Sequence, residues 1–342
     1  MQSFNSLVID YKDNKHNISF RTKIFRELKH KEVLVKIKYS SLNYKDALSV
    51  SGKSKIIRGE EMVPGLDFSG TVIDSKSKKF NKGEKVLATG SGLGETIDGG
   101  FSEFIYVPDN ILLHVPKKLS LLSSMQIGTA GFTAAISIEK MLLNKQSISS
   151  GPIVVTGASG GVGSISINIL SNIGFETIAI TRNKNYIPYL KKIGATSVII
   201  PKILEKKSLN NKLFAGSIDN VGGDLLDWLI KSTKDNGNIV SVGMVSSYNL
   251  NTTVFPLIMR GINILGVSST NYPNNKRRFI WEKLSNKYKP SQLSLINKNC
   301  INLKEVINYS QIVATDNTYP YLLLCSGKKV NRIPKFWTII KR

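Results

Sequence analysis

Hydrophobic and polar positions alternate in short runs over roughly the first 120 residues of the chain. Such runs are typical of half-buried β-strands, because successive side chains on a strand point to opposite faces. Turn signals such as Pro64-Gly65 and Asn81-Lys82-Gly83 separate them, and a helical pattern from Tyr44 to Val50 interrupts them. The runs read SLVIDY, EVLVKIKYSS, DFSGTVID, EKVLATG and FSEFIYVP. We therefore expect a small barrel-like β domain over residues 1–122.

From residue 123 the pattern changes to longer helical stretches between apolar strands. Residues 124–143 predict two short helices broken near Gly131, and strands then alternate with helices up to residue 272. This spacing indicates right-handed crossovers and a parallel, doubly wound sheet. One amphipathic helix and short β-like runs follow. The predicted fold is α/β, with a β-barrel domain, a doubly wound domain over residues 123–272, and a return to the first domain over residues 273–342.

The motif IVVTGASGGVG, at residues 153–163, carries the most specific chemistry. Four residues suited to a buried strand lead into Gly157, Gly160, Gly161 and Gly163, and a helix-forming run up to Gly174 follows. Glycines let the backbone turn sharply and approach a pyrophosphate, whose charge meets the unpaired N–H groups at the helix start near Gly161. A glycine cluster alone is often only a loop. Its position between an apolar strand and a helix favours a dinucleotide site.

The next predicted strand indicates which dinucleotide binds. This strand, residues 176–180, ends in Thr181-Arg182-Asn183-Lys184, and Lys202 follows the strand after it. An acidic residue at this tip would hydrogen-bond the ribose of NAD and repel the 2′-phosphate of NADP. Here hydroxyl, guanidinium and amide groups stand in its place, and arginine binds phosphate through two parallel hydrogen bonds. The sequence therefore favours NADPH, with the alternative that Arg182 and Lys184 are ordinary surface cations.

Composition narrows the class of protein further. The chain has 342 residues, enough for two domains, and is 41% hydrophobic. No apolar run approaches the roughly 20 residues of a membrane span, and the N-terminus lacks the basic-then-apolar order of a signal peptide. Cys300 and Cys325 fit a reducing compartment, and with three scattered histidines they form no metal-ligand pattern. We expect a cytoplasmic protein without a metal site or a membrane partner.

The net charge of +23 could indicate a nucleic-acid partner. However, most of the basic residues are lysines spread along the chain, and isoleucine and asparagine are also abundant, which indicates a lysine-favouring coding bias on a solvated surface. The dense cluster Lys276-Arg277-Arg278 begins a predicted helix with a charged outer face. Attraction of a polyanionic small substrate remains an alternative. We expect a small-molecule substrate and no nucleic-acid partner.

Several blocks in register resemble a known family. They are SSLNYKDAL (40–48), GKSKIIR (52–58), PGLDFSGTV (64–72), IGTAGFTA (127–134) and VVTGASGGVG (154–163). Over about residues 1–275 they resemble the zinc-free medium-chain dehydrogenase/reductases, most closely the acrylyl-CoA reductase and putative quinone oxidoreductase family. The resemblance implies a GroES-like domain, a Rossmann domain and a homodimer. It also implies NADPH-dependent reduction of an activated C=C bond, acrylyl-CoA giving propionyl-CoA.

The resemblance further implies a set of cofactor contacts. Residues of the glycine turn and of the strand tip would hold phosphates, and Met244, Ile258 and Ser269 would lie at strand ends near the nicotinamide. The implied set is Tyr44, Ser159, Gly160, Gly161, Val162, Thr181, Arg182, Asn183, Lys202, Met244, Ile258 and Ser269. The resemblance ends at the C-terminus, where the family's Gly-Arg pair and closing strand are replaced by a longer run, and no motif places Arg332 in the missing role.

The chemistry suggests candidate catalytic residues. Reduction of an unsaturated thioester needs hydride at the β carbon, donors to the enolate oxygen and a proton for the α carbon. Tyr44 is the candidate proton donor, with cofactor packing as its alternative role; Asn43 and Lys45 are candidate helpers, and Asp46 is a candidate partner of Lys45.

Three basic residues of GKSKIIR are a candidate patch for the phosphates of CoA; they are Lys53, Lys55 and Arg58. No Ser–His–Asp or Cys–His arrangement can be recognised in the sequence, which disfavours a hydrolase acting on acyl groups. Two other functions remain open: a quinone or enone reductase, and a non-catalytic binding protein loaded with NADPH.

Overall fold

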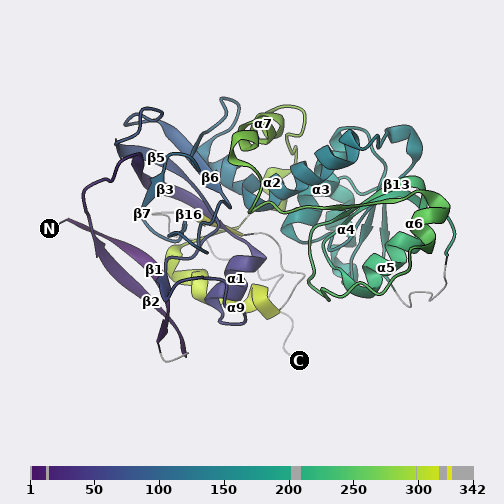
Figure 1. Cartoon of the computed structure of the whole chain (residues 1–342), viewed down its shortest axis with the longest axis horizontal. Helices are drawn as coiled ribbons and strands as arrows, with labels where there is room; N and C mark the ends of the chain where they lie inside the picture. Colours follow the sequence, from purple (N-terminus) through teal and green to yellow (C-terminus); the bar gives the residue numbers. More distant parts are fainter. Residues whose placement is uncertain (1, 13–14, 202–208, 298, 316–321, 326–342) are drawn as a thin grey trace.

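Two domains lie side by side in the computed structural model, which describes residues 2–12, 15–201, 209–297, 299–315 and 322–325 (Figure 1). A mostly antiparallel sheet organises the N-terminal domain, and β7 (Phe104–Pro108) pairs with β3 outside its main path. The order of the main path is β15 (Cys300–Ile301), β16 (Leu322–Cys325), β3 (Glu32–Leu42), β5 (Asp67–Ser75), β6 (Lys85–Thr89) and β8 (Leu113–His114). Alternate buried side chains of β3, β5, β6 and β7 form one apolar core, as the pattern predicts.

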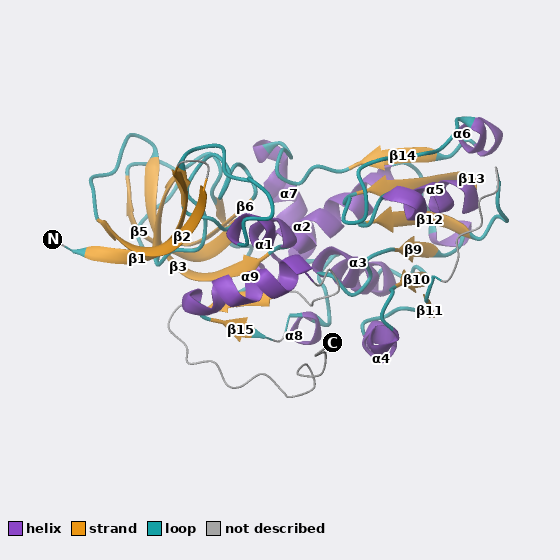
Figure 2. Cartoon of the chain, turned by 90° about the horizontal axis from the view of Figure 1, so that it is seen from below, coloured by secondary structure: helices purple, strands orange, loops and turns teal. Residues whose placement is uncertain are grey.

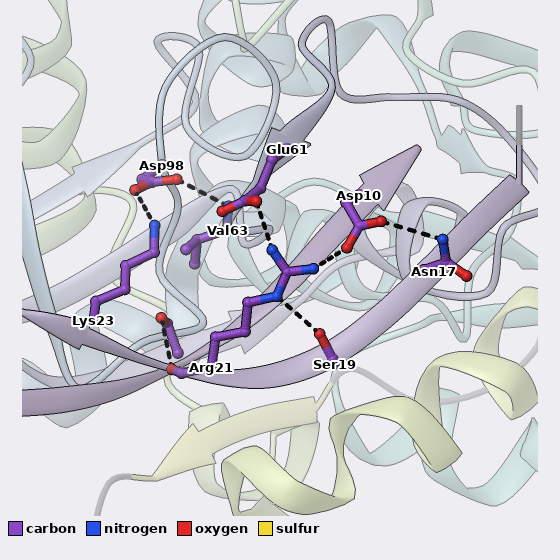
Figure 3. Close-up of polar contacts among 9 residues, drawn as sticks. Asp10, Asn17, Ser19, Arg21, Lys23, Glu61, Val63 and Asp98 are labelled. Atoms are coloured by element: carbon purple, nitrogen blue, oxygen red, sulfur yellow. Dashed lines mark hydrogen bonds and ion pairs between the residues drawn. The ribbon is translucent and has the colours of Figure 1, made fainter. Parts of the chain in front are cut away.

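A second, three-stranded sheet flanks this domain. Its order is β2 (Lys15–Ile24), β1 (Ser3–Lys12) and β4 (Glu61–Met62). Arg21 on β2 donates to Asp10 on β1 and, at 2.5 Å, to Glu61 on β4 (Figure 3). Asp98 accepts from Lys23 Nζ at 2.8 Å and from the backbone N–H of Val63 at 2.9 Å. The contacts of Asp98 therefore tie this sheet to the loop after β6.

A six-stranded parallel sheet forms the second domain. Its order is β11 (Ser197–Ile199), β10 (Thr177–Ile180), β9 (Ile153–Val155), β12 (Phe214–Asp219), β13 (Thr233–Ser241) and β14 (Asn263–Gly266). Ile153 and Val155 pack into the core with α3 (Gly161–Asn172) and α4 (Ile187–Lys192), whereas Val154 packs toward α5 (Gly223–Ser232). Because both faces are covered at the centre of the sheet, all three residues of β9 are apolar and buried. The predicted doubly wound sheet is confirmed.

Helix α2 (Leu121–Leu143) packs against both domains (Figure 2). Its break lies at Gly128, with φ 51° and ψ −159°, and not near Gly131 as expected. A Cβ on Gly131 would lie 2.5 Å from Ile127 Cγ2, so this glycine serves close packing. By length and composition α2 could span a membrane, so the expectation that no run approaches this length is wrong; 78% of its most apolar window is buried, as in a core helix.

The C-terminal part of the chain packs on α2 before it adds strands to the sheet of the N-terminal domain. Helices α7 (Asn274–Ser285) and α8 (Leu293–Ile296) pack with α2 and α3, because Ile280, Trp281 and Leu284 form an apolar face. The chain then adds β15, α9 (Val306–Thr315) and β16, and α9 packs against α1 (Tyr44–Val50).

The irregular tail contributes a strand of the first domain. Leu322 pairs with Leu42, so the run LLLC forms β16 beside β3. The two cysteines, expected as separate thiols, lie on neighbouring strands with Cα atoms 5.9 Å apart and form a Cys300–Cys325 disulfide. Lys202 and Arg332 lie outside the described residues.

Candidate active site

The glycine turn joins β9 to α3 at the carboxyl edge of the parallel sheet. Gly157 has φ 55°, and Gly160 N donates to Gly157 O at 3.0 Å. Helix α3 begins at Gly161, as predicted, and no side chain caps its N-terminus. A Cβ on Gly163 would lie 2.3 Å from Gly157 O, whereas one on Gly160 would have its nearest neighbour at 3.3 Å. The turn therefore leaves N–H groups of the helix free, which fits a pyrophosphate.

Residues at the end of β12, which were not among the predicted site residues, brace this turn. Thr156 Oγ1 donates to the buried carboxylate of Asp219 at 2.6 Å, and Asn220 Nδ2 donates to Thr156 O at 2.8 Å. Asp219 also accepts from Gly222 N at 2.8 Å. Burial raises the pKa of Asp219. An Asp-Asn pair that directly follows an apolar strand is the signal that could have predicted this brace.

The predicted strand tip lies beside the glycine turn. The N–H of Ala158 donates to Ile180 O at 3.2 Å, which joins the turn to the end of β10. Thr181 is buried, and its Oγ1 accepts from Asn183 N at 3.3 Å. Arg182 is exposed and pairs with no described carboxylate. A guanidinium next to a glycine turn can bind the 2′-phosphate of NADP.

The three residues expected near the nicotinamide lie in different places. Met244 follows β13 and is 69% exposed, and Ser269 follows β14, so both lie beyond the carboxyl ends of strands. Ile258 lies on α6 (Phe255–Arg260), where Arg260 Nη1 donates to Thr233 O at the start of β13. Helix α6 therefore lies at the edge where the strands begin (Figure 2), opposite the edge that carries Met244 and Ser269. The connection that follows β13 runs back across the sheet before β14.

Tyr44 opens α1 in the N-terminal domain, next to a pair of buried carboxylates. Asp46 accepts from Asn43 N and Leu66 N, both at 2.9 Å, and Asn43 Nδ2 bridges Asp46 and Asp67 at 3.1 and 3.2 Å. Burial, followed by the charge of Asp67, raises the pKa of Asp46 to about 7. Asp46 therefore holds α1 in place and is not the partner of Lys45.

The kink in α2 reaches the same carboxylates. Because Gly128 leaves the helical conformation, the N–H of Thr129 is free to donate to Asp67 Oδ2, at 2.8 Å. Ser41 donates to Asp67 through both its N–H and its hydroxyl. Burial raises the pKa of Asp67. The motifs SSLNYKDAL, PGLDFSGTV and IGTAGFTA thus meet at one buried carboxylate.

The predicted CoA patch is divided by the fold. Lys53 Nζ donates to Ala314 O at 2.7 Å, and Lys55 Nζ lies 4.8 Å from the centroid of the Tyr11 ring. Arg58 instead faces a cavity that also borders Glu95. The three cations therefore do not act as a single surface.

Arg277 has a buried role that its position in a basic cluster does not indicate. Its side chain is 1% exposed, although the cluster was expected on an outer face. The guanidinium donates to the carbonyl oxygens of Thr89 at 2.7 Å, Ser269 at 2.6 Å and Thr270 at 2.9 Å, and lies 4.9 Å from the centroid of the Phe132 ring. Burial lowers the pKa of Arg277 to about 10. Arg277 thus joins the end of β6 to the segment that carries Ser269.

Among the described residues no group of three or more His, Cys, Asp or Glu side chains could hold a metal ion. Hydrogen bonds from Asn43, Ser41 and Thr129 surround the carboxylate of Asp67. The buried end of this site is therefore organised by amide and hydroxyl donors.

Comparison with known proteins gives matches across both domains. A model of the alcohol dehydrogenase GroES-like domain matches residues 29–117, and a zinc-binding dehydrogenase model matches residues 161–286. The putative quinone oxidoreductase YhfP of Bacillus subtilis is 35% identical over 88% of this chain and 92% of that protein. The probable acrylyl-CoA reductase AcuI of Escherichia coli is 36% identical over 90% of this chain and 95% of that protein.

Solved structures agree with these matches. The YhdH oxidoreductase of Salmonella enterica, in complex with NADP, superposes with a TM-score of 0.89 and 33% identity over 94% of this chain and 99% of that one. YhfP with NAD bound superposes with a TM-score of 0.90 and 32% identity over 95% of this chain and all of that one. The chain therefore belongs to the medium-chain dehydrogenase/reductase family, in the group of the acrylyl-CoA reductases and putative quinone oxidoreductases.

Proposed function

We propose that this protein is an NADPH-dependent reductase of an activated C=C bond, with acrylyl-CoA as its substrate and propionyl-CoA as its product. The observation that carries the proposal is the uncapped start of α3 beside a strand tip that bears Arg182 and no acidic residue. The relatives named acrylyl-CoA reductase support the substrate. Related structures hold NADP in one case and NAD in another, and we propose that Arg182 selects between the two in this protein.

The chain's own residues perform three tasks in this reaction. NADPH supplies the hydride when it is bound. The free N–H groups of α3 hold its pyrophosphate, and Arg182 holds its 2′-phosphate. Tyr44 donates a proton near the α carbon, because its hydroxyl has no described hydrogen-bond partner and it stands at the start of α1. The Asp46–Asn43–Asp67 hydrogen bonds hold α1, and therefore Tyr44, in position.

The direct test is NADPH oxidation with acrylyl-CoA, crotonyl-CoA and a benzoquinone in parallel. Preferential turnover of acrylyl-CoA supports the proposal, and no turnover of any of the three contradicts an enzymatic function. Preferential turnover of the quinone would instead support the second candidate, a quinone reductase, which the similarity to YhfP favours.

The role of Tyr44 has its own test. In Tyr44→Phe, loss of a proton donor lowers kcat by about a hundredfold or more. A packing aromatic would leave kcat unchanged, because phenylalanine keeps the ring, and that result would remove Tyr44 from the mechanism.

Arg182 is expected to decide between NADPH and NADH. Removing a hydrogen bond to a charged phosphate costs about 1.5–3 kcal/mol, so Arg182→Ala raises the KM for NADPH by roughly ten- to a hundredfold. The KM for NADH serves as the internal control, since NADH has no 2′-phosphate. An equal rise in both constants would contradict the assignment.

We also propose a homodimer formed through the β14 edge of the parallel sheet. Strand β14 is last in the sheet order, so its outer edge presents backbone groups to a second copy. Exposed apolar side chains lie on β14 and along the segment that leads into it; they are Tyr248, Leu250, Val254, Phe255, Ile258, Met259 and Ile264. Light scattering should report a dimer for the wild type and for Ile24→Asp in the other domain, and a monomer for Ile264→Asp. A dimeric Ile264→Asp would contradict this interface.

We propose that the protein is cytoplasmic and binds neither membranes nor nucleic acid. The burial of α2, which is 78% buried over its most apolar window, supports this. Cell fractionation tests the location, and a salt-dependent shift of DNA or RNA by the purified protein would contradict the second statement.

A further inference from the structure

A cavity of about 480 Å³ lies between the two domains. One wall comes from residues 91–96, in the loop after β6, and the other from residues 270–274, which lead from β14 into α7. Arg58 completes the lining. The volume is in the range of cavities that bind small molecules.

The cavity adjoins both sides of the candidate active site. Thr270 directly follows Ser269, and Arg277 holds the carbonyl oxygens of both residues. On the other side, Glu95 forms an ion pair with Lys45, the residue next to Tyr44. A Cβ on Gly90 would lie 3.1 Å from Thr270 Cα, so the two walls are in close contact at this end. We expect the reacting carbon to lie near Tyr44 and Ser269. A ligand in the cavity would therefore extend from this carbon outward.

The walls of the cavity are polar and their net charge is positive. Glu95 is neutralised by Lys45, and its side chain is 9% exposed. Arg58 is exposed, and among the described residues no carboxylate pairs with it. Its backbone N–H donates to Glu95 O at 2.8 Å, which holds the base of the side chain at the wall. Hydroxyl and amide groups make up most of the remaining polar lining; they are Ser91, Thr96, Thr270, Asn271 and Asn274.

We propose that this cavity binds the pantetheine arm of an acyl-CoA and that Arg58 pairs with its diphosphate. The proposal rests on the proposed function. The two amides and the hydroxyl of pantetheine match neutral donors and acceptors, and a guanidinium binds phosphate through two parallel hydrogen bonds. Lys53 and Lys55 face α9 and Tyr11, so Arg58 alone of the three cations of GKSKIIR takes part.

Three substrates distinguish the contribution of the pantetheine from that of the phosphates. Acrylyl-CoA carries pantetheine and phosphates, acrylyl-pantetheine lacks the diphosphate and nucleotide, and methyl vinyl ketone lacks the arm. We expect Arg58→Ala to raise the KM for acrylyl-CoA about tenfold and to leave the other two constants unchanged. Thr96→Trp, which fills the cavity from an exposed position, is expected to raise the KM for both thioesters about tenfold or more and to spare the ketone. The KM for NADPH stays unchanged in both variants and shows that they fold.

Lys55→Ala is the matched control, because it removes one positive charge from the same segment outside the cavity. It is expected to change none of the constants. An equal effect of Lys55→Ala and Arg58→Ala on acrylyl-CoA would show general attraction by the basic surface and would overturn the proposal. The proposal also fails if the wild type reduces acrylyl-CoA and neither cavity variant changes its KM, in which case the proposed function still stands. If the wild type reduces the ketone and neither thioester, the proposed substrate is overturned, and the proposal that the cavity binds a pantetheine arm is overturned with it.

Discussion

Replacement of Arg277 by methionine tests whether one buried guanidinium holds the cofactor segment in place. The side chain is 1% exposed and donates hydrogen bonds to three carbonyl oxygens, those of Thr89, Ser269 and Thr270. A buried acceptor that loses its partner costs about 1–3 kcal/mol. Removing the guanidinium also recovers its burial cost, which is visible in its lowered pKa. We therefore take the lower limit for each carbonyl and expect about 3 kcal/mol of lost stability in total.

The same change should weaken cofactor binding. Ser269 lies in the segment that Arg277 holds, so greater freedom of this segment raises the KM for NADPH in Arg277→Met. Arg277→Lys keeps the charge, but a single ammonium group cannot reproduce the planar fork that reaches Thr89 and the Ser269–Thr270 segment together. It should recover only part of the stability and of the NADPH affinity.

Urea unfolding followed by tryptophan fluorescence measures the loss in the free energy of unfolding, because Trp281 lies on α7 with Arg277. Arg278→Ala is the control, since Arg278 is the exposed neighbour on the same helix. The reasoning is refuted if Arg277→Met unfolds within about 0.5 kcal/mol of the wild type, the scale of an ordinary surface substitution, and keeps the KM for NADPH.

Two further predictions concern the buried carboxylates and the glycine turn. Because the pKa of Asp46 is raised to about 7 in the fold, the free energy of unfolding should fall as pH rises from about 4 to about 7, where the unfolded carboxyl is already ionised. The non-titrating Asp46→Asn lacks this contribution, so parallel urea stability curves for the two proteins across this range would contradict the assignment. Gly163→Ala should lower the melting temperature, because its Cβ would lie 2.3 Å from Gly157 O, whereas Gly160→Ala should fold normally and lose NADPH affinity. Calorimetry with and without NADPH distinguishes the two variants. Normal NADPH binding by Gly160→Ala would contradict the pyrophosphate site.

Local patterns predicted much of the parallel domain. The strand, turn and helix around residues 153–172 follow from apolar β-branched residues, glycine placement and helical periodicity, all of which act over a few residues. The same holds for the strand tip at Thr181 and Arg182. The break in α2 lies at Gly128 and not near Gly131, a difference that the sequence does not show, since a glycine that adopts a positive φ and one that permits close packing look alike in sequence.

The sequence by itself determined the two kinds of domain, the glycine turn and the absence of an acidic residue at the strand tip, because each depends on neighbours along the chain. Only the tertiary structure decided which charges pair and which are buried. Lys45 pairs with Glu95, 50 residues away, and Arg277 serves Thr89, 188 residues away, so neither contact leaves a local pattern. The cavity between the domains has the same origin, because its walls come from segments that meet only when both sheets are packed against α2.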